Sequence, residues 1–253
     1  MNNYKLSIQY DGHKYNGWQK QGNTDSTIQG ILEDTISKYL NALDSNSPPI
    51  ELNGSGRTDA GVHADGQVAN FKTELEISID DFLTSINDNL PKDIRVFEAE
   101  KVDIFFHARL SATGKFYSYY IDNGDVASVF KKNYNLRVEE PLNLGAMRLA
   151  VSFLEGEHDF ISFCAKTDLK KSTIKTMYDI KITSDNGLIR ICFHGNGFLY
   201  NMVRILSGTL IEIGTGKMSP GYILEILAKK DRTLAGPTVS GNALFLDKVE
   251  YHK

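Results

Sequence analysis

The chain has 253 residues, of which 41% are hydrophobic, 24% charged and 10% aromatic. This composition is typical of a folded globular protein and excludes intrinsic disorder as its main state. No apolar run reaches the roughly 18 residues of a membrane span, and the first residues lack the apolar stretch of a secretory signal. The two cysteines, Cys164 and Cys192, are far apart. Their spacing favours reduced core residues of a cytoplasmic protein over a disulfide framework or a zinc site.

Acidic and basic residues are unevenly distributed along the chain. Lys and Arg number 28 against 32 Asp and Glu, a net charge of −4. Residues 1–110 contain 10 basic and 17 acidic residues, whereas residues 111–253 contain 18 and 15. The second part includes a lysine cluster, for which a solvated loop is the simplest interpretation: Lys166, Lys170, Lys171 and Lys175. The global charge weakens a nucleic-acid hypothesis without excluding a basic cleft.

The first hundred residues predict alternating strands and helices. Apolar alternation and β-rich composition place strands at residues 6–10, 50–54, 66–72 and 94–100. Helices are expected at 26–41, with Ser26 and Gln29 at capping-box spacing, and at 78–90, between Ser78 and Pro91. The order strand-helix-strand-strand-helix-strand is that of a ferredoxin-like, or RRM-like, unit.

The second part of the chain repeats this order. Strands are expected at residues 116–122, 177–183, 188–194 and 243–251, and helices at 143–155, 198–213 and 220–230. Asn186-Gly187 predicts a tight hairpin turn between two of these strands. The sequence therefore predicts an α+β protein made of two ferredoxin-like βαββαβ halves, residues 1–105 and 106–253, with a central cleft between them.

The segment Gly54–Ala64 is the strongest candidate for a catalytic loop. Its three glycines favour close approaches of the backbone that a Cβ would block. Arg57 and Asp59, two residues apart, share one face of an extended segment, and a neighbouring arginine keeps a carboxylate ionised. An ionised carboxylate suits a nucleophile rather than a general acid. The simpler alternative is a surface turn with a local ion pair.

Two residues of the second half invite a functional and a structural interpretation. Alternation on the aromatic strand 116–120 puts Tyr117 and Tyr119 on one face, which either belongs to the core or presents a ring that stacks on a base. Arg204 lies inside an otherwise apolar helix and so requires a partner. That partner is either a structural carboxylate or an anionic group of a ligand.

Other catalytic motifs do not fit the sequence. Gly214-Thr215-Gly216-Lys217 lacks the hydroxyl residue and the leading glycine of a phosphate-binding loop, so it is interpreted as a helix end. A dinucleotide fingerprint, a nucleophile elbow and a Cys-His pair are also missing. Asp59, His63 and Asp65 are not accompanied by a metal-binding motif, and no metal is expected.

Residues 56–64, GRTDAGVHA, resemble the catalytic loop of the TruA-type tRNA pseudouridine synthases. Further segments match the family in order over nearly the whole chain: Tyr10-Asp11-Gly12 through Gly17-Trp18-Gln19, Gly66-Gln67-Val68, Phe106-His107-Ala108-Arg109, Ser111-Ala112 with Lys115 and Tyr117, Asp159-Phe160 with Ser162-Phe163, Asn201-Met202-Val203-Arg204, and Asp231-Arg232 through Ala235-Gly236-Pro237-Thr238. The segment Val239–Ala243 departs from the family's Pro-rich approach to the last strand.

The resemblance implies an isomerase that converts uridine to pseudouridine at positions 38, 39 and 40 in the anticodon arm of tRNA. Asp59 matches the catalytic aspartate, which adds to the ribose or to the base, or removes a ribose proton. Tyr117 matches the tyrosine that stacks on the target base. Arg57 and Arg204 match positions that orient the carboxylate or help displace the base. The resemblance further implies a cytoplasmic homodimer that needs no cofactor, no metal and no membrane.

Two hypotheses from other classes compete with the isomerase. A non-catalytic RNA-binding protein with RRM-like sheets would lack the expected RNP1 run and would leave Arg57 and Asp59 without a role. A carboxylate-based N-glycosidase would let water complete the reaction and release free base. The mass of treated tRNA distinguishes base release from the other two hypotheses, because isomerisation and simple binding preserve mass. Carbodiimide mapping of pseudouridine then distinguishes isomerisation from simple binding.

Overall fold

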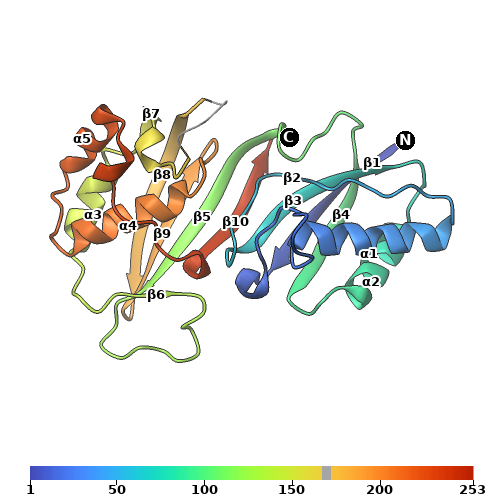
Figure 1. Ribbon diagram of the computed structural model, residues 1–253, viewed down its shortest axis with the longest axis horizontal. Helices are drawn as coiled ribbons and strands as arrows, with labels where there is room; N and C mark the ends of the chain where they lie inside the picture. Colours follow the sequence, from blue (N-terminus) through green and yellow to red (C-terminus); the bar gives the residue numbers. More distant parts are fainter. Residues whose placement is uncertain (167–171, 253) are drawn as a thin grey trace. The chain divides into compact units, whose positions relative to one another are not determined.

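The computed structural model describes residues 1–166 and 172–252, and the chain divides into two compact units (Figure 1). Unit 1 comprises Met1–Thr113 with Leu246–Lys253, and unit 2 comprises Gly114–Phe245. Lys170 and Lys171 of the lysine cluster lie outside the described residues. In the two described ranges, no helix combines the length and apolarity that crossing a membrane requires.

The elements of unit 1 follow the predicted order. They are β1 (Asn2–Tyr10), α1 (Ile28–Leu43), β2 (Asn53–Gly54), β3 (His63–Thr73), α2 (Ile79–Asn89) and β4 (Ile94–Val102), with a short 3-10 turn at Gly12–Lys14. Antiparallel pairing gives the strand order β4-β1-β3, and β2 also pairs with β3. The mixed α+β class predicted from the sequence is confirmed.

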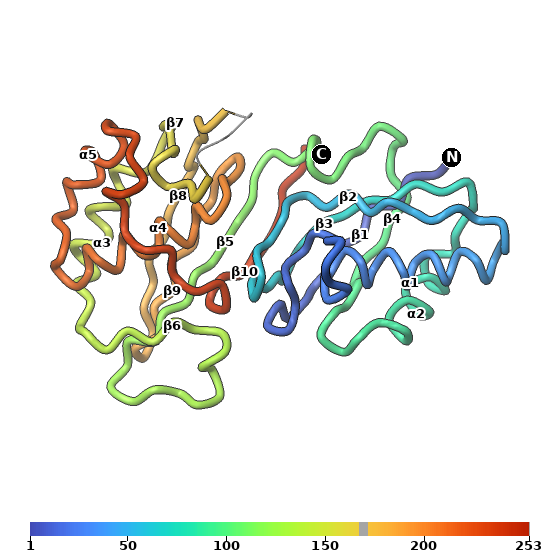
Figure 2. The backbone as a smooth tube through the Cα atoms, in the orientation of Figure 1, coloured from blue at the N-terminus to red at the C-terminus, as the bar shows by residue number. Residues whose placement is uncertain are grey.

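The core of unit 1 lies between this sheet and its two helices. Helices α1 and α2 lie side by side in the backbone trace (Figure 2), and Tyr39 of α1 meets Phe82 of α2 edge-on at 5.3 Å. Phe82 also packs on Phe71 of β3, with the ring centroids 5.9 Å apart. Leu6 and Ile8 of β1 are fully buried. Each such side chain contributes about 1.5–3 kcal/mol by leaving water, so β1 is fixed at the centre of the unit.

Strand β3 begins at His63, three residues before the predicted start. Its register with β1 changes between the pairs Ile8–Gln67 and Tyr10–Ala64, so β3 carries one extra residue there. This is a β-bulge, which bends a strand and increases its local twist. A search for strict alternation misses strand residues beyond a bulge, and this explains why the sequence assigned residues 63–65 to the loop.

The strands of unit 2 pair antiparallel in the order β5-β9-β8-β7. Its strands are β5 (Ala112–Asp122), β7 (Gly156–Asp159), β8 (Ile174–Asp185) and β9 (Leu188–Gly195), and β6 (Leu136–Arg137) runs parallel to β5. Its helices are α3 (Leu144–Val151), α4 (Met202–Gly214) and α5 (Tyr222–Lys229), with 3-10 turns at Ile161–Phe163, Arg232–Leu234 and Gly241–Ala243. Strand β10 (Leu244–Tyr251) begins in unit 2 and continues in unit 1, where it neighbours β3.

The start of α4 differs from the prediction. The sequence places a helix from residue 198, whereas α4 begins at Met202 because Asn201 adopts a left-handed conformation with φ of 59°. Asparagine tolerates this conformation better than most L-residues, and such strain gathers at functional sites. The predicted turn between β8 and β9 at Asn186-Gly187 is confirmed.

Candidate active-site loop and its supports

The loop between β2 and β3 carries two of the four predicted site residues. Asp59 is half-buried and Arg57 is exposed, while Thr58 between them is buried, as alternation in an extended segment requires. The carbonyl of Asp59 accepts a hydrogen bond from the Val62 N–H at 3.2 Å. Gly61, at the third position of this turn, has φ of +77°, which a type II turn demands of that position. Asp59 therefore opens a tight turn immediately before β3.

Hydrogen bonds from buried side chains hold the residues that precede Asp59. The Tyr10 hydroxyl on β1 lies 2.8 Å from the Thr58 hydroxyl, and burial raises the pKa of Tyr10 to about 12. Gln67 of β3 is fully buried, and its amide donates to the Gly56 carbonyl at 3.1 Å. The Ser55 hydroxyl donates to the side-chain oxygen Oε1 of Gln67 at 2.7 Å. The sheet thus fixes the loop on both sides of Arg57.

The segment that follows β1 supports the loop from a second direction. Gly17 has φ of +91°, and a Cβ there would lie 2.6 Å from the Thr58 carbonyl oxygen and 3.0 Å from the Asp59 carbonyl carbon. The Trp18 N–H donates to the Thr58 carbonyl at 3.0 Å. The Trp18 ring is buried directly beneath Gly54, where a Cβ would approach it to 2.6 Å. Only glycine at position 17 permits the close contact between the backbone there and that of residues 58–60.

The arginine of the loop faces solvent. Among the residues that the structure describes, Arg57 forms no side-chain hydrogen bond or ion pair. The surface turn considered as the simpler alternative therefore lacks the local ion pair between Arg57 and Asp59. An exposed guanidinium can donate two parallel hydrogen bonds to the oxygens of one anion, which is a common mode of phosphate recognition.

His63 serves the core of unit 1. It is 1% exposed, and its Nδ1 lies 3.1 Å from the Gly12 backbone nitrogen, which donates to it, and 3.0 Å from an Asp11 carboxylate oxygen. Asp65 is exposed and accepts a hydrogen bond from the Gln9 side chain at 3.1 Å. Within the described residues, no group of three His, Cys, Asp or Glu side chains is arranged to hold a metal ion.

Tyr117 lies on β5 in unit 2. It is 7% exposed, and its ring meets Phe198 edge-on at 5.1 Å with an interplanar angle of 80°. Tyr119, on the same face, is completely buried and donates its hydroxyl proton to the Ser240 carbonyl at 2.9 Å. Burial raises the pKa of Tyr119 well above its usual range. Tyr119 is therefore a core residue, whereas Tyr117 retains a small exposed surface.

Arg204 is half-buried in the first turn of α4. Its Nε donates to the Val239 carbonyl at 2.7 Å, and one terminal nitrogen donates to the Asn201 side-chain oxygen at 3.0 Å. The left-handed Asn201 thus brings its own side chain back to the guanidinium. These two acceptors orient the guanidinium at the start of α4.

The four predicted site residues divide equally between the units, with Arg57 and Asp59 in unit 1 and Tyr117 and Arg204 in unit 2. The sequence alone assigns no role to the residues that hold the loop: Tyr10, Gly17, Trp18 and Gln67. Each lies in a segment that matches the TruA pattern, which was the available signal. Their function became visible only from hydrogen bonds between residues far apart in the sequence.

Comparisons with known proteins agree with the resemblance. A family model described as tRNA pseudouridine synthase matches residues 6–110 and 150–252. The chain is 43% identical over 251 residues to tRNA pseudouridine synthase A of Bacillus sp. (strain KSM-64), covering 99% of this chain and 100% of the relative. It is 41% identical over 252 residues to tRNA pseudouridine synthase A of Ruminiclostridium cellulolyticum, with the same coverage of each chain.

A solved structure of a Cbf5-Nop10-Gar1 complex aligns with 82% of this chain and 54% of its own, at 12% identity and a TM-score of 0.30. At that score the likeness supports no statement about fold or function. The family model and the curated relatives support an assignment to a family, because they match nearly the whole chain and the relatives are about 40% identical to it. The chain therefore belongs to the tRNA pseudouridine synthase family, whose members are isomerases.

Proposed function

We propose that this protein converts uridine to pseudouridine at positions 38, 39 and 40 in the anticodon stem-loop of tRNA, with Asp59 as the catalytic carboxylate and without a cofactor. The observation that carries the proposal is the support of the Asp59 loop from behind by two separate segments of unit 1. Tyr10 holds Thr58 through a 2.8 Å contact, and Gly17 packs against residues 58–60. A catalytic group is effective when its surroundings fix it before substrate binds.

The reaction balances without an external reagent. The bond between C1′ of the ribose and N1 of uracil breaks, and a bond between C1′ and C5 forms. C5 loses a proton and N1 gains one, so no electrons and no atoms are exchanged with the surroundings. The site must therefore provide an anionic group, hold the detached base and accept the proton from C5.

The surroundings of each residue support its proposed role. Asp59 is half-buried at a turn, which keeps it reachable by a flipped nucleotide. The exposed Arg57 is available to a phosphate, and Arg204 is oriented by the Val239 carbonyl and Asn201. Tyr117 offers a ring stabilised edge-on by Phe198 for contact with the target base.

Further features of the proposal follow from the family. The functional halves are residues 1–105, with the aspartate loop, and residues 106–253, with Tyr117 and Arg204. The cleft implied between these halves stays a prediction. We further propose that the protein acts in the cytoplasm as a homodimer, that it binds the anticodon arm of tRNA, and that it uses neither metal nor membrane.

The decisive experiment replaces the proposed catalytic carboxylate. Asp59→Ala and Asp59→Asn are expected to abolish pseudouridine formation, measured by carbodiimide mapping of tRNA, while tRNA affinity stays within about twofold of the wild type, because an amide or a methyl group cannot act as an anion. Asp65→Ala is the matched control, since Asp65 is an exposed carboxylate six residues away. Turnover by Asp59→Ala at more than a trace of the wild-type rate would refute the assignment.

The mass of the treated tRNA, measured together with its carbodiimide reactivity, separates the proposed isomerase from its rivals. An isomerase leaves the mass of the RNA unchanged while carbodiimide reactivity appears at the modified position. Loss of a uracil would indicate an N-glycosidase, and binding without either change would indicate a non-catalytic RNA-binding protein.

A further inference from the structure

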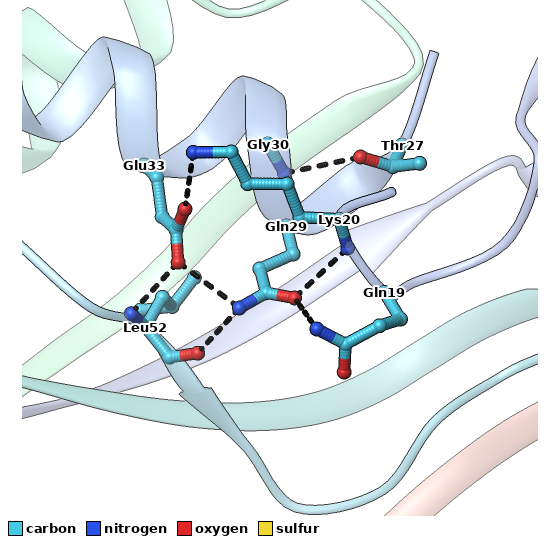
Figure 3. A network of polar contacts seen from close by, with 7 residues as sticks. All are labelled: Gln19, Lys20, Thr27, Gln29, Gly30, Glu33 and Leu52. Carbon is cyan, nitrogen blue, oxygen red and sulfur yellow. Dashed lines mark hydrogen bonds and ion pairs between the residues drawn. The ribbon is translucent and has the colours of Figure 1, made fainter. Parts of the chain in front are cut away.

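Behind the active-site loop lies a partly buried polar network that none of the proposed catalytic roles uses. Its members are Gln19, Lys20, Gln29, Glu33 and Leu52, hereafter the Gln29 network (Figure 3). Gln29 and Glu33 are one turn apart on α1 and are 7% and 8% exposed. Buried polar groups are costly unless they are fully hydrogen-bonded, so a network of this kind specifies one arrangement of the segments that it joins.

Gln29 uses its whole side-chain amide. Its Oε1 accepts hydrogen bonds from the Lys20 backbone at 3.0 Å and from the Gln19 side chain at 2.7 Å. Its Nε2 donates to the Leu52 carbonyl at 3.1 Å and to Glu33 Oε1 at 3.0 Å. Two acceptor and two donor positions are what a primary amide offers, and all four are occupied. Figure 3 shows the amide of Gln29 between Lys20 on one side and Leu52 on the other.

Glu33 completes the same connection. Its Oε1 also accepts from the Leu52 N–H at 3.1 Å, and its Oε2 lies 3.2 Å from the ammonium nitrogen of Lys20. Leu52 is therefore held at both its N–H and its carbonyl by side chains of α1. This residue directly precedes β2, so its position determines where the chain enters the active-site loop.

The other end of the connection reaches the back of the loop. The backbone N–H groups of Ile28 and Gln29 donate to the carbonyls of Gly17 and Trp18 at 3.2 and 2.9 Å. Trp18 in turn donates its own N–H to the Thr58 carbonyl at 3.0 Å. The first turn of α1 thus satisfies its free N–H groups with the segment that presses on residues 58–60.

From this geometry we infer that Gln29 is a positioning residue, which holds the two segments flanking the active-site loop and thereby fixes the direction of the Asp59 carboxylate. This inference rests on the proposed function. Gln29 belongs to α1 and touches residues 19, 20, 33 and 52, so it acts through these residues and not on the nucleotide. Removing its amide leaves the 17–20 and 52–54 segments hydrogen-bonded to α1 through Glu33 and the helix backbone alone, so they can shift relative to each other. Displacements near 1 Å lower catalytic rates by roughly 100-fold.

The test compares Gln29→Met with Asn87→Leu. Both replacements remove a side-chain amide from a helix of unit 1 and keep its approximate volume. Asn87 of α2 accepts from the Val96 N–H at 3.0 Å and donates to the Val96 carbonyl at 2.7 Å, so it joins α2 to β4 and not to the loop. Single-turnover rates at saturating tRNA, tRNA dissociation constants and thermal unfolding are measured for each variant.

Gln29→Met is expected to lower the single-turnover rate by about 10- to 100-fold, with the tRNA dissociation constant within about twofold of the wild type. Asn87→Leu is expected to lose comparable thermal stability and to keep its rate within about twofold. A normal rate in Gln29→Met, or an equal loss of rate in Asn87→Leu, would overturn the inference. Asp59→Ala in the same assay separates the two proposals: if it is active, the proposed site is wrong, and if it is inactive while Gln29→Met is normal, only the positioning role is wrong.

Gln29→Glu keeps the test decisive if Gln29→Met does not fold. The introduced carboxylate still accepts from Lys20 and Gln19, but its second oxygen faces the Leu52 carbonyl and Glu33 Oε1, which repel it. Protonation converts that oxygen to a donor. The ratio of the wild-type rate to the Gln29→Glu rate should therefore shrink by at least about threefold between about pH 8 and about pH 5. A ratio that does not change with pH contradicts the inference.

Discussion

Gly17→Ala tests whether the backbone behind Asp59 controls its chemistry. The new methyl group would lie 2.6 Å from the Thr58 carbonyl oxygen. Carbon–oxygen contacts require about 3.3–3.6 Å, so the two segments must separate by roughly 0.7–1.0 Å. A displacement of this size is expected to slow the reaction by about 10- to 100-fold.

The stability cost of the same change has two sources. The left-handed φ of +91° at Gly17 costs an L-residue about 1–2 kcal/mol, and the overpacking costs about 1–3 kcal/mol more. The matched control is Gly216→Ala, where φ is +80° and, apart from its chain neighbours, no atom of the described residues lies within 4 Å of the new methyl group. This control carries the conformational cost alone and should leave the rate unchanged.

Single-turnover pseudouridine formation, followed by carbodiimide mapping, gives the rates, and chemical denaturation gives the free energies of unfolding. The reasoning is refuted if Gly17→Ala reacts within about twofold of Gly216→Ala. In that case residues 58–60 would either move without consequence or not require the support of Gly17.

Three further predictions concern binding, the base contact and alkaline stability. The affinity for tRNA should fall steeply as salt is raised, despite the net charge of −4, because phosphate contacts release counterions; a flat salt dependence would contradict an extended RNA surface. Tyr117→Phe should retain the base contact, whereas Tyr117→Leu should lose about 1–3 kcal/mol of stacking, measured as tRNA affinity and single-turnover rate beside thermal unfolding. Full activity of the Leu variant would remove Tyr117 from the site. Burial raises the pKa of Tyr10 to about 12 in the folded protein, so the contribution of its neutral hydroxyl to stability is present below about pH 10 and is lost between about pH 10 and 12. The difference in unfolding free energy between wild type and Tyr10→Phe should therefore change by up to about 3 kcal/mol over that interval. A constant difference would argue against burial of this hydroxyl.

Alternation and helical periodicity were sufficient to predict the α+β class and most of the elements. The strand β1 and the helix α1 were recognisable because their apolar residues recur with the period of a strand and of a helix. The prediction failed where a local irregularity interrupts the period. The bulge before Gln67 concealed the first residues of β3, and the left-handed Asn201 delayed α4 by one turn. Such features depend on pairing with distant residues, which no local pattern records.

The residues of the candidate site likewise fall into those that the sequence identifies and those that it does not. Asp59 and Arg57 could be singled out because an arginine and a carboxylate in a glycine-rich loop have recognisable chemistry. Gln67 and Gln29 could not, because a glutamine in a strand or a helix has no distinctive pattern. Their importance arises because the side chain of each forms three hydrogen bonds to partners between 9 and 57 positions away. Thus sequence reasoning identifies reactive groups more readily than the residues that hold them.

The position of Trp18 makes its intrinsic fluorescence a probe of the active-site loop. It is the single tryptophan of the chain, and it is 2% exposed. Its ring lies beneath Gly54, and its backbone N–H donates a hydrogen bond to the Thr58 carbonyl. All tryptophan fluorescence therefore originates at the back of the active-site loop. Any movement of residues 54–58 on binding RNA would change the packing of this one indole, and its emission would record that movement in unlabelled protein, in real time and before chemistry begins.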